Sequence, residues 1–489
     1  MNTAETLLLA SLAVPLATGA GVVLARHRPN PREAVSLLGA AALFGVVVLL
    51  AGQGLAPAAT RLHLWTLLPG LSLALAVEPL GLVFALLASG LWFLTTVYSI
   101  GYLRAKKEEH QTRFYLFFAL ALTATMGIAA AGNLFTLFVF YELLTLSTYP
   151  LVTHIGNRAA IEGGRTYLTV LIGTSIGLLL PAILLTWHWA GTLDFVAGGI
   201  LAGRVTSAQA GLLLALFVLG VGKAAIMPMH RWLPAAMVAP SPVSALLHAV
   251  AVVKAGAFTL IKVVLYVFGT GFLATVPAER LLLWLAGGTV VVASLVALRQ
   301  DNLKRLLAYS TIGQLATIVL AALCLSPSAE IGASLHLVMH ALGKITLFFA
   351  AGAIYVAAGK TQVSELDGIG RRMPYTLAAF ALGALTMIGL PPAGGFVSKW
   401  YILSGALQAD QWFVLAVLLA STALNAGYFL PIIHRAFFRA ESHAPRHAHG
   451  EAPGPMLGAL VGTAVLSVLL FFYHAPLVRW LVARLGVGA

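Results

Sequence analysis

The chain is a succession of long apolar runs separated by short polar stretches. An apolar run of about 20 residues spans a bilayer as a helix. Fourteen such runs cover residues 3–25, 33–52, 72–98, 112–131, 133–155, 165–190, 210–228, 241–266, 279–298, 303–324, 330–358, 376–404, 411–437 and 455–484. The pattern predicts an all-α polytopic membrane protein of about 14 transmembrane helices, with residues 1–489 forming a single transmembrane domain.

Composition and charge agree with this prediction. Hydrophobic residues make up 60% of the chain and charged residues 9%, whereas soluble proteins average about a quarter charged residues. The net charge of +13 would suit a nucleic-acid-binding protein, but the charges lie in short loops between the apolar runs, which favours membrane topology instead. The first run precedes its basic residues, the reverse of a cleaved signal peptide, so we expect it to remain as a helix.

Lysine and arginine are distributed unevenly between the two sides of the predicted bundle. Loops that follow even-numbered helices hold Arg61, Arg204 and Arg280. Loops that follow odd-numbered helices hold nineteen: Arg26, Arg28, Arg32, Arg104, Lys106, Lys107, Arg113, Arg158, Arg165, Arg231, Arg299, Lys304, Arg305, Lys360, Arg371, Arg372, Arg435, Arg439 and Arg446. Because cytoplasmic loops are the basic ones, we expect both termini on the non-cytoplasmic side.

Several ionisable side chains fall inside the predicted helices. Glu142 lies near the centre of helix 5, and the others are Lys223, Lys254, Lys262, Lys344 and Lys399. A charge at bilayer depth costs a few kcal/mol at least, so it should face protein or water and is a functional candidate. Beside a lysine the acid can stay ionised and act as a switch, because protonating it frees the lysine to pass on its proton.

A structural ion pair that locks two helices is the alternative interpretation of an isolated acid and lysine. One acid cannot neutralise five lysines, however, which favours a proton relay. Lys262 is close to the end of helix 8, where we expect its side chain to snorkel to the interface.

Two predicted helices are interrupted beside a lysine. Lys223 in helix 7 is followed by four prolines, and Lys399 in helix 12 follows the sequence GLPPAGG. A helix broken at membrane depth is tolerated where its backbone is buried or lines a wet cavity. Paired breaks in two halves are typical of internal repeats in transporters. We therefore expect two inverted five-helix repeats, helices 4–8 (residues 112–266) and 9–13 (residues 279–437), with proline kinking for packing alone as the alternative.

Histidines accompany these lysines. His336, His340 and Lys344 recur every four residues in helix 11 and should share one helical face, where titratable imidazoles can carry protons. Zinc is the rival ligand, but the HExxH glutamate and a third ligand are absent from this sequence. His248 and Lys254 are six residues apart in helix 8, so either that helix is irregular or water bridges them.

No cofactor signature accompanies these groups. The sequence has no haem, flavin, iron–sulfur or nucleotide motif, and Cys324 alone forms neither a disulfide nor a CxxC metal pair. We therefore expect no cofactor-binding residues and no metal site. The histidine-rich stretch HAPRHAHGE, which begins at residue 443, is expected to be a solvated loop.

Five stretches together identify a family resemblance: NLFTLFVFYELLTLSTYPLV, GKAAIMPMHRWLPAAMVAPSPVSALLHAVAVVKAG, RQDNLKRLLAYSTIGQLATI, HALGKITLFFAAGAI and GLPPAGGFVSKWYILSGAL. They resemble the antiporter-like membrane subunits of respiratory complex I and of Mrp-type cation/proton antiporters. The resemblance implies fourteen helices with two inverted repeats. It also implies roles for particular residues: Glu142 and Lys223 as a switching pair, Lys254 or His248 as the central relay, His340 and Lys344 as the link in helix 11, and Lys399 as the terminal site.

The resemblance also narrows the type of family member. M-type complex I subunits have glutamate where Lys399 stands, whereas lysine is typical of the L- and N-type subunits and of the D-type Mrp subunit. The chain length and the stretch GLPPAGGFVSKWY most resemble the D-type Mrp subunit and its relatives in membrane-bound hydrogenases.

The function implied is that of a proton-translocating antiporter-like subunit of a multi-subunit complex in a bacterial or archaeal cell membrane, with Na⁺/H⁺ exchange left open. Its expected partners are other membrane subunits, protons, Na⁺ and the lipid bilayer, and not nucleic acid. The sequence leaves three alternatives open: a pump subunit of a complex I-type NADH:quinone oxidoreductase or membrane-bound hydrogenase, a membrane subunit of an inorganic-carbon-accumulating complex, and a scaffold whose polar residues only hold helices together.

Overall fold

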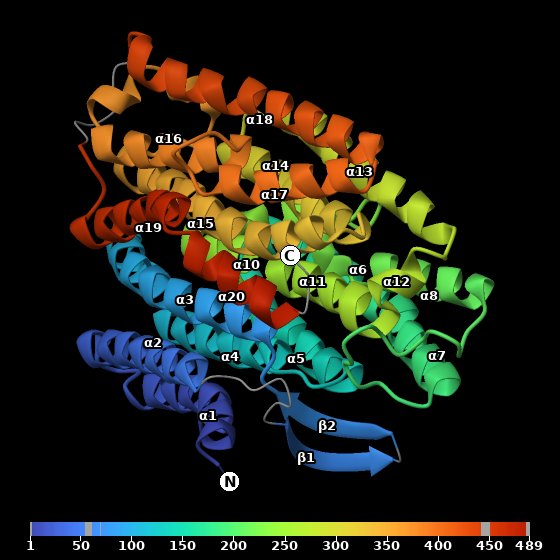
Figure 1. Ribbon diagram of the computed structural model, residues 1–489. Helices are drawn as coiled ribbons and strands as arrows, with labels where there is room; N and C mark the ends of the chain where they lie inside the picture. Colours follow the sequence, from blue (N-terminus) through green and yellow to red (C-terminus); the bar gives the residue numbers. More distant parts are fainter. Residues whose placement is uncertain (1, 54–60, 69, 442–449, 486–489) are drawn as a thin grey trace.

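The computed structural model describes residues 2–53, 61–68, 70–441 and 450–485, without the side chains of 247–249, 484 and 485. Its helices lie side by side in one bundle, and a two-stranded hairpin projects from one edge (Figure 1). The longer helices are α1 (Thr3–Leu24), α2 (Pro29–Gly52), α3 (Pro79–Lys106), α4 (Gln111–Ala129), α5 (Leu134–Val152), α6 (Arg158–Thr174), α13 (Ala278–Leu298), α14 (Leu303–Leu323), α15 (Pro327–Ala358), α18 (Trp412–Phe438) and α19 (Gly454–Phe472).

Shorter helices complete the bundle. They are α7 (Leu180–Ala190), α8 (Ser207–Gly220), α9 (Trp232–Ala235), α10 (Ser241–Ala249), α11 (Val252–Lys262), α12 (Thr270–Leu273), α16 (Pro374–Ile388), α17 (Gly395–Gln408) and α20 (Ala475–Leu485). Two π-helical segments, η1 (Ser175–Leu179) and η4 (Val263–Phe268), continue α6 and α11. The 3₁₀ segments are η2 (Gly222–Ala224), η3 (Ala236–Val238), η5 (Val363–Glu365) and η6 (Ile369–Arg371).

The prediction of an all-α polytopic membrane protein is confirmed. Among the described residues, 11 helices are long and apolar enough to cross a membrane, with α6, η1 and α7 forming one of them. Predicted helices 7, 8 and 12 are divided: α8 precedes η2, α9 and η3, α10 precedes α11, and α16 precedes α17. Helices therefore occupy all fourteen predicted runs, and the breaks lie where the prolines and glycines predicted them in helices 7 and 12.

The expected start of helix 3 is wrong. The apolar run predicts helix 3 from residue 72, but α3 begins at Pro79 and the preceding residues form the hairpin of β1 (Arg61–Leu68) and β2 (Leu71–Ala76). Proline is favoured at the first position of a helix, where its missing N–H costs no hydrogen bond. Strand β2 is also hydrogen-bonded to the turn between α4 and α5, where Gly132 N donates to Ala74 O at 2.9 Å.

The predicted last helix, 455–484, is also divided. α19 ends at Phe472 and α20 begins at Ala475, with Pro476 in its first turn. Because proline interrupts a helix interior but is tolerated in a first turn, a new helix starts here. The histidine-rich stretch that begins at residue 443 falls mainly outside the described residues, so its solvation stays a prediction.

Helix α15 forms the enclosed centre of the bundle. It is 32 residues long, and its most apolar stretch of 18 residues is 100% buried inside the protein. Helices α3, α10, α14, α16, α17 and α19 pack around it, and it runs through the middle of the bundle in Figure 1. The corresponding stretches of α1, α2 and α19 are only 33% buried, so these helices lie at the periphery of the bundle. Polar side chains on α15 are therefore shielded from lipid.

A buried histidine in the α5–α6 loop makes stability depend on pH. His154 is 3% exposed, and burial together with the Arg113 guanidinium lowers its pKa to about 4. An unfolded histidine has a pKa near 6.5. Between these values the unfolded state binds more protons, so stability falls as the pH falls through this window.

We expect His154→Phe to flatten this pH dependence, because a phenyl ring can keep the edge-on contact that His154 makes with Phe114 at 5.7 Å. The difference should amount to about 3 kcal/mol across the window. Thermal unfolding of the detergent-solubilised protein at pH values on either side of the window measures it, with exposed His434→Phe as the control. An unchanged pH response in His154→Phe would contradict the expectation.

Candidate functional site

Lys223 lies directly in the break of helix 7. It belongs to η2 and has no exposed surface. Its Nζ donates to Tyr141 O at 2.8 Å and to Thr145 Oγ1 at 2.6 Å, and it lies 3.1 Å from the centroid of the Tyr141 ring. Helix α5 therefore surrounds this lysine with neutral acceptors and an aromatic face, which stabilise a cation.

Glu142 does not form the expected ion pair with a lysine. No described Lys, Arg or His nitrogen lies within 4.0 Å of its carboxylate, and Oε1 is buried without a hydrogen-bond partner. Glu142 and Lys223 thus form no direct ion pair, but the charge of Glu142 still acts on Lys223, and their role as a switching pair stays a prediction. Tyr141 and Thr145 share one face of α5, whereas Glu142 is rotated by about 100° around the helix. The exposed Leu143 and Leu146 show that this side of α5 borders the bundle surface.

A glycine allows α11 to approach the break at Lys223. A Cβ on Gly256 would overlap the carbonyl carbon of Lys223 and the backbone nitrogen of Ala224. Only a residue without a side chain fits such a close approach of two backbones. Gly256 lies two residues from Lys254, so the same contact brings helices 7 and 8 together near Lys223 and Lys254.

Lys254 joins helix 8 to the enclosed helix α15. It has no exposed surface, and its Nζ is hydrogen-bonded to Nδ1 of His340. α10 ends at Ala249 and α11 begins at Val252, so helix 8 is irregular between His248 and Lys254, which is one of the two predicted explanations of their spacing. The side chain of His248 lies outside the described part of the chain, and its role stays a prediction.

His336 lies one turn from His340 on α15. The two rings are nearly parallel, at 16°, with centroids 6.0 Å apart. His336 Nδ1 is 2.8 Å from Ser398 Oγ, and Nε2 is 2.9 Å from Gln314 Oε1. Both imidazoles are fully buried, and the contacts of their nitrogens link α15 to α11, α14 and α17.

Lys399 lies at the break of helix 12. Its Nζ donates to Met387 O at 3.0 Å and to Ile388 O at 2.9 Å, the last carbonyls of α16. The C-terminus of a helix carries a partial negative charge that favours a cation. The carbonyl of Met387 also accepts from Gln314 Nε2 at 3.4 Å and from Asn425 Nδ2 at 3.3 Å. It therefore connects Lys399 with the polar groups around His336.

Lys344 continues the polar face of α15 by another turn. It is fully buried, its Nζ donates to Leu307 O at 3.2 Å, and it lies 5.7 Å from the centroid of the Phe429 ring. Its described partners are thus a carbonyl and an aromatic face, as for Lys223.

The structure brings together a buried polar chain that runs from Lys254 through His340, His336, Gln314 and the Met387 carbonyl to Lys399. Sequence reasoning missed Gln314, Ser398 and Asn425. The signal for Gln314 was its place inside an apolar run, where a primary amide needs buried partners. Ser398 and Asn425 carried no comparable signal, because both residue types are common at helix ends and in membrane helices.

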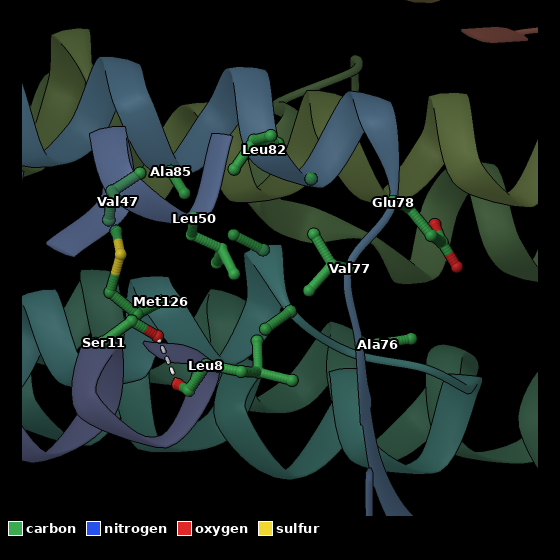
Figure 2. Close-up of a pocket in the computed structure, with 13 residues that line it drawn as sticks. Leu8, Ser11, Val47, Leu50, Ala76, Val77, Glu78, Leu82, Ala85 and Met126 are labelled. Carbon is green, nitrogen blue, oxygen red and sulfur yellow. Dashed lines mark hydrogen bonds between the residues drawn. The ribbon is translucent and has the colours of Figure 1, made fainter. Parts of the chain in front are cut away.

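Lys262 does not snorkel, and that expectation is wrong. It is fully buried and forms an ion pair with Glu78 at 2.7 Å, and its Nζ donates to Ala131 O at 2.9 Å. The Phe195 ring covers it at 3.7 Å. Glu78 precedes α3 rather than lying inside it, at the edge of a small cavity between α1, α2, α3 and α4 (Figure 2). Snorkelling failed because the start of α3 supplies a carboxylate within the protein.

Known proteins share this sequence pattern. The family described as "NADH:quinone oxidoreductase/Mrp antiporter, TM" matches residues 131–425, which include every residue of the buried polar chain. The chain belongs to this family. It is therefore an antiporter-like membrane subunit, as the resemblance implied.

Two curated relatives show how far the likeness to this family extends. NADH-quinone oxidoreductase subunit N of Desulforudis audaxviator (strain MP104C) is 35% identical over 375 residues, which are 76% of this chain and 74% of that protein. Na(+)/H(+) antiporter subunit A1 of Staphylococcus aureus (strain bovine RF122 / ET3-1) is 32% identical over 384 residues, 74% of this chain but only 46% of that subunit. This chain thus matches less than half of the antiporter subunit.

Two solved structures of family members match almost the whole chain. A chain of the membrane-bound sulfane sulfur reductase, an archaeal respiratory membrane complex, superposes with a TM-score of 0.85 at 25% identity, covering 98% of this chain and 97% of its own. A chain of the Mrp complex from Dietzia sp. DQ12-45-1b gives 0.86 at 20% identity, covering 99% and 97%. The fold is that of subunits in multi-subunit membrane complexes.

Proposed function

We propose that this subunit moves protons across the bilayer and that the buried polar chain from Lys254 to Lys399 serves this transfer, with its lysine and histidine side chains carrying the proton and with Gln314 and the Met387 carbonyl holding them in position. The observation that carries the proposal is the run of contacts in which Lys254, His340, His336, Gln314 and the Met387 carbonyl follow one another to Lys399. The residues proposed to take part are Glu142, Lys223, His248, Lys254, His336, His340, Lys344 and Lys399.

The partners of these lysines suit proton exchange. The described hydrogen bonds of the amino groups of Lys223, Lys344 and Lys399 go to carbonyls and hydroxyls, and that of Lys254 goes to an imidazole. A buried ammonium without a carboxylate keeps its charge at a large desolvation cost. Losing the proton removes that cost, so each of these lysines can alternate between charged and neutral forms. Lys262, beside Glu78, is held as a cation and is left out of the relay.

The arrangement in the membrane follows from the basic loops. We propose that loops after odd-numbered helices face the cytoplasm of a bacterial or archaeal cell, with both termini on the other side. We also retain the two inverted repeats, residues 112–266 and 279–437, because helices 7 and 12 are both broken at a lysine. We propose protons, Na⁺ and bilayer lipid as the small partners. We also propose that this chain is more similar to the D-type Mrp subunit than to other types of family member.

The test measures proton flux in liposomes that contain the complex purified with its own partners. His340→Gln removes the link between Lys254 and His336 and should lower flux roughly 100-fold. His434→Gln makes the same change at an exposed position and should leave flux unchanged. Assembly of the His340→Gln complex with full flux would refute the relay.

Two driving reactions fit the family. Exchange for Na⁺ is supported by the likeness to an Na(+)/H(+) antiporter subunit, and a redox-driven pump by the likeness to NADH-quinone oxidoreductase subunit N and to the archaeal respiratory complex. An imposed Na⁺ gradient should drive proton movement only in the first case. Mass spectrometry of the copurified subunits provides an independent answer, because redox subunits accompany only the second.

A further inference from the structure

His336 has a different hydrogen-bond partner on each ring nitrogen. Nε2 faces Gln314 Oε1 at 2.9 Å. The amide of Gln314 is oriented by its other end, since Nε2 of the glutamine donates to Met387 O at 3.4 Å. His336 Nε2 must therefore carry a hydrogen in both charge states. A proton gained or lost by His336 is gained or lost at Nδ1, which faces Ser398.

Ser398 can satisfy only one acceptor at a time. Its hydroxyl has a single hydrogen, yet two acceptors are within reach: His336 Nδ1 at 2.8 Å and Gly395 O at 3.1 Å. When His336 is neutral, the hydroxyl donates to Nδ1. When His336 is protonated, Nδ1 donates to Ser398 Oγ and the hydroxyl turns to Gly395 O. By rotating about its C–O bond, the hydroxyl can therefore pair with Nδ1 in either charge state of His336 and keeps its own hydrogen.

We propose that Ser398 is a positioning residue whose rotating hydroxyl stabilises His336 in both its neutral and its protonated form and links that change to Gly395 in the first turn of α17. Gly395 begins α17, and Lys399 follows Ser398 directly. The proposal deepens the proposed function and rests on it. It assigns to a serine, which carries no charge of its own, control over how readily His336 holds a proton.

The surroundings of His336 make this hydroxyl important. The titratable groups that act on it are Lys399 from α17, Lys254 from α11 and His340 on its own helix. Every one of them is a base, so a proton on His336 meets no carboxylate. Its positive charge is offset by Ser398 Oγ and Gln314 Oε1 alone among the described hydrogen-bond partners of the ring. Removing the serine would leave a charged N–H buried without an acceptor, which costs more than an unpaired neutral nitrogen.

The test compares Ser398→Ala with Ser398→Thr in the purified complex. We expect the alanine variant to show a profile of flux against pH that is displaced to lower pH by roughly one unit, with a lower maximum. The threonine variant keeps the hydroxyl and should return the wild-type profile. Ser404→Ala removes a hydroxyl farther along α17 and serves as the matched control.

Nitrogen-15 NMR of histidine-labelled complex provides the readout at His336, identified by the signal lost in His336→Gln. Because Gln314 keeps the hydrogen on Nε2, wild type and Ser398→Ala should both show the Nε2–H tautomer when His336 is neutral, whereas His336 in Ser398→Ala should become protonated only at lower pH. If Ser398→Ala does not assemble, Ser398→Cys, a weaker donor of similar shape, should shift the profile in the same direction by less. An unchanged flux profile and an unchanged titration of His336 in the assembled variant would overturn the proposal.

Failure of this inference is distinguishable from failure of the relay. Lys399→Met should remove flux if the relay operates. Full flux in Lys399→Met would refute the proposed function whatever Ser398 does. Loss of flux in Lys399→Met together with a wild-type profile in Ser398→Ala would overturn only the role of the serine.

Discussion

Replacement of Lys223 by methionine is expected to lower proton flux through the intact complex roughly 100-fold, the usual contribution of a positioned acid–base group. Methionine fills a similar volume without a charge, so the break of helix 7 should still close around it. What disappears is the donor to Tyr141 O and Thr145 Oγ1. Flux in liposomes and recovery of the assembled complex measure the two consequences separately.

Lys106→Met is the matched control, because this lysine is exposed at the end of α3 and lies over the Tyr355 ring. Glu142→Gln tests the acid of the same switch, with the exposed Glu162→Gln beside it. If Lys223 only held helices together, its methionine variant would either fail to assemble or assemble with undiminished flux. Either result would contradict a role in proton transfer.

Gly256→Ala should have the second large effect, this time on assembly. Alanine normally stabilises a helix by about 1 kcal/mol relative to glycine. Here the added methyl group would overlap the backbone of Lys223 and Ala224, and forcing α11 away from η2 should cost about 3 kcal/mol. The expected result is a large fall in thermal stability and in the yield of complex.

Gly288→Ala provides the comparison, because it makes the same exchange inside α13, where an added Cβ meets nothing within 4 Å. It should leave the thermal midpoint unchanged or raise it. Fluorescence-detected gel filtration after heating measures both variants. A Gly256→Ala protein as stable as Gly288→Ala would show that the packing of α11 against η2 does not depend on a close backbone contact at Gly256.

The fold was predictable to the extent that bilayer thickness governs it. Runs of about 20 apolar residues admit only helices in lipid, and the prolines marked the breaks at helices 7 and 12. The hairpin before α3 was missed, because LSLALA is as apolar as a helical run and neither its pairing with β1 nor its hydrogen bond from Gly132 is visible in a hydropathy pattern. A hydropathy pattern therefore does not distinguish this paired strand from the start of a helix.

The site was predictable in its members but not in its connections. Lysines and histidines inside apolar runs can be recognised in the sequence, because an ionisable side chain at membrane depth costs free energy. Their partners depend on how each helix is rotated about its axis, which the sequence leaves undetermined. Tyr141 and Glu142 are adjacent in the chain, yet only Tyr141 is hydrogen-bonded to Lys223. The partners of His336 and Lys399 were missed for the same reason, since a backbone carbonyl such as that of Met387 has no signature in the sequence.

The complete enclosure of α15 has a physiological consequence. Fatty-acid composition changes with growth temperature, and the resulting thinning or thickening of the bilayer strains only helices that touch acyl chains. The most apolar stretches of α1, α2 and α19 are only 33% buried in this chain, whereas that of the histidine-bearing helix is completely buried. The spacing of its imidazoles should therefore be the same in short-chain and long-chain liposomes, which makes the conducting core independent of the cell's lipid supply.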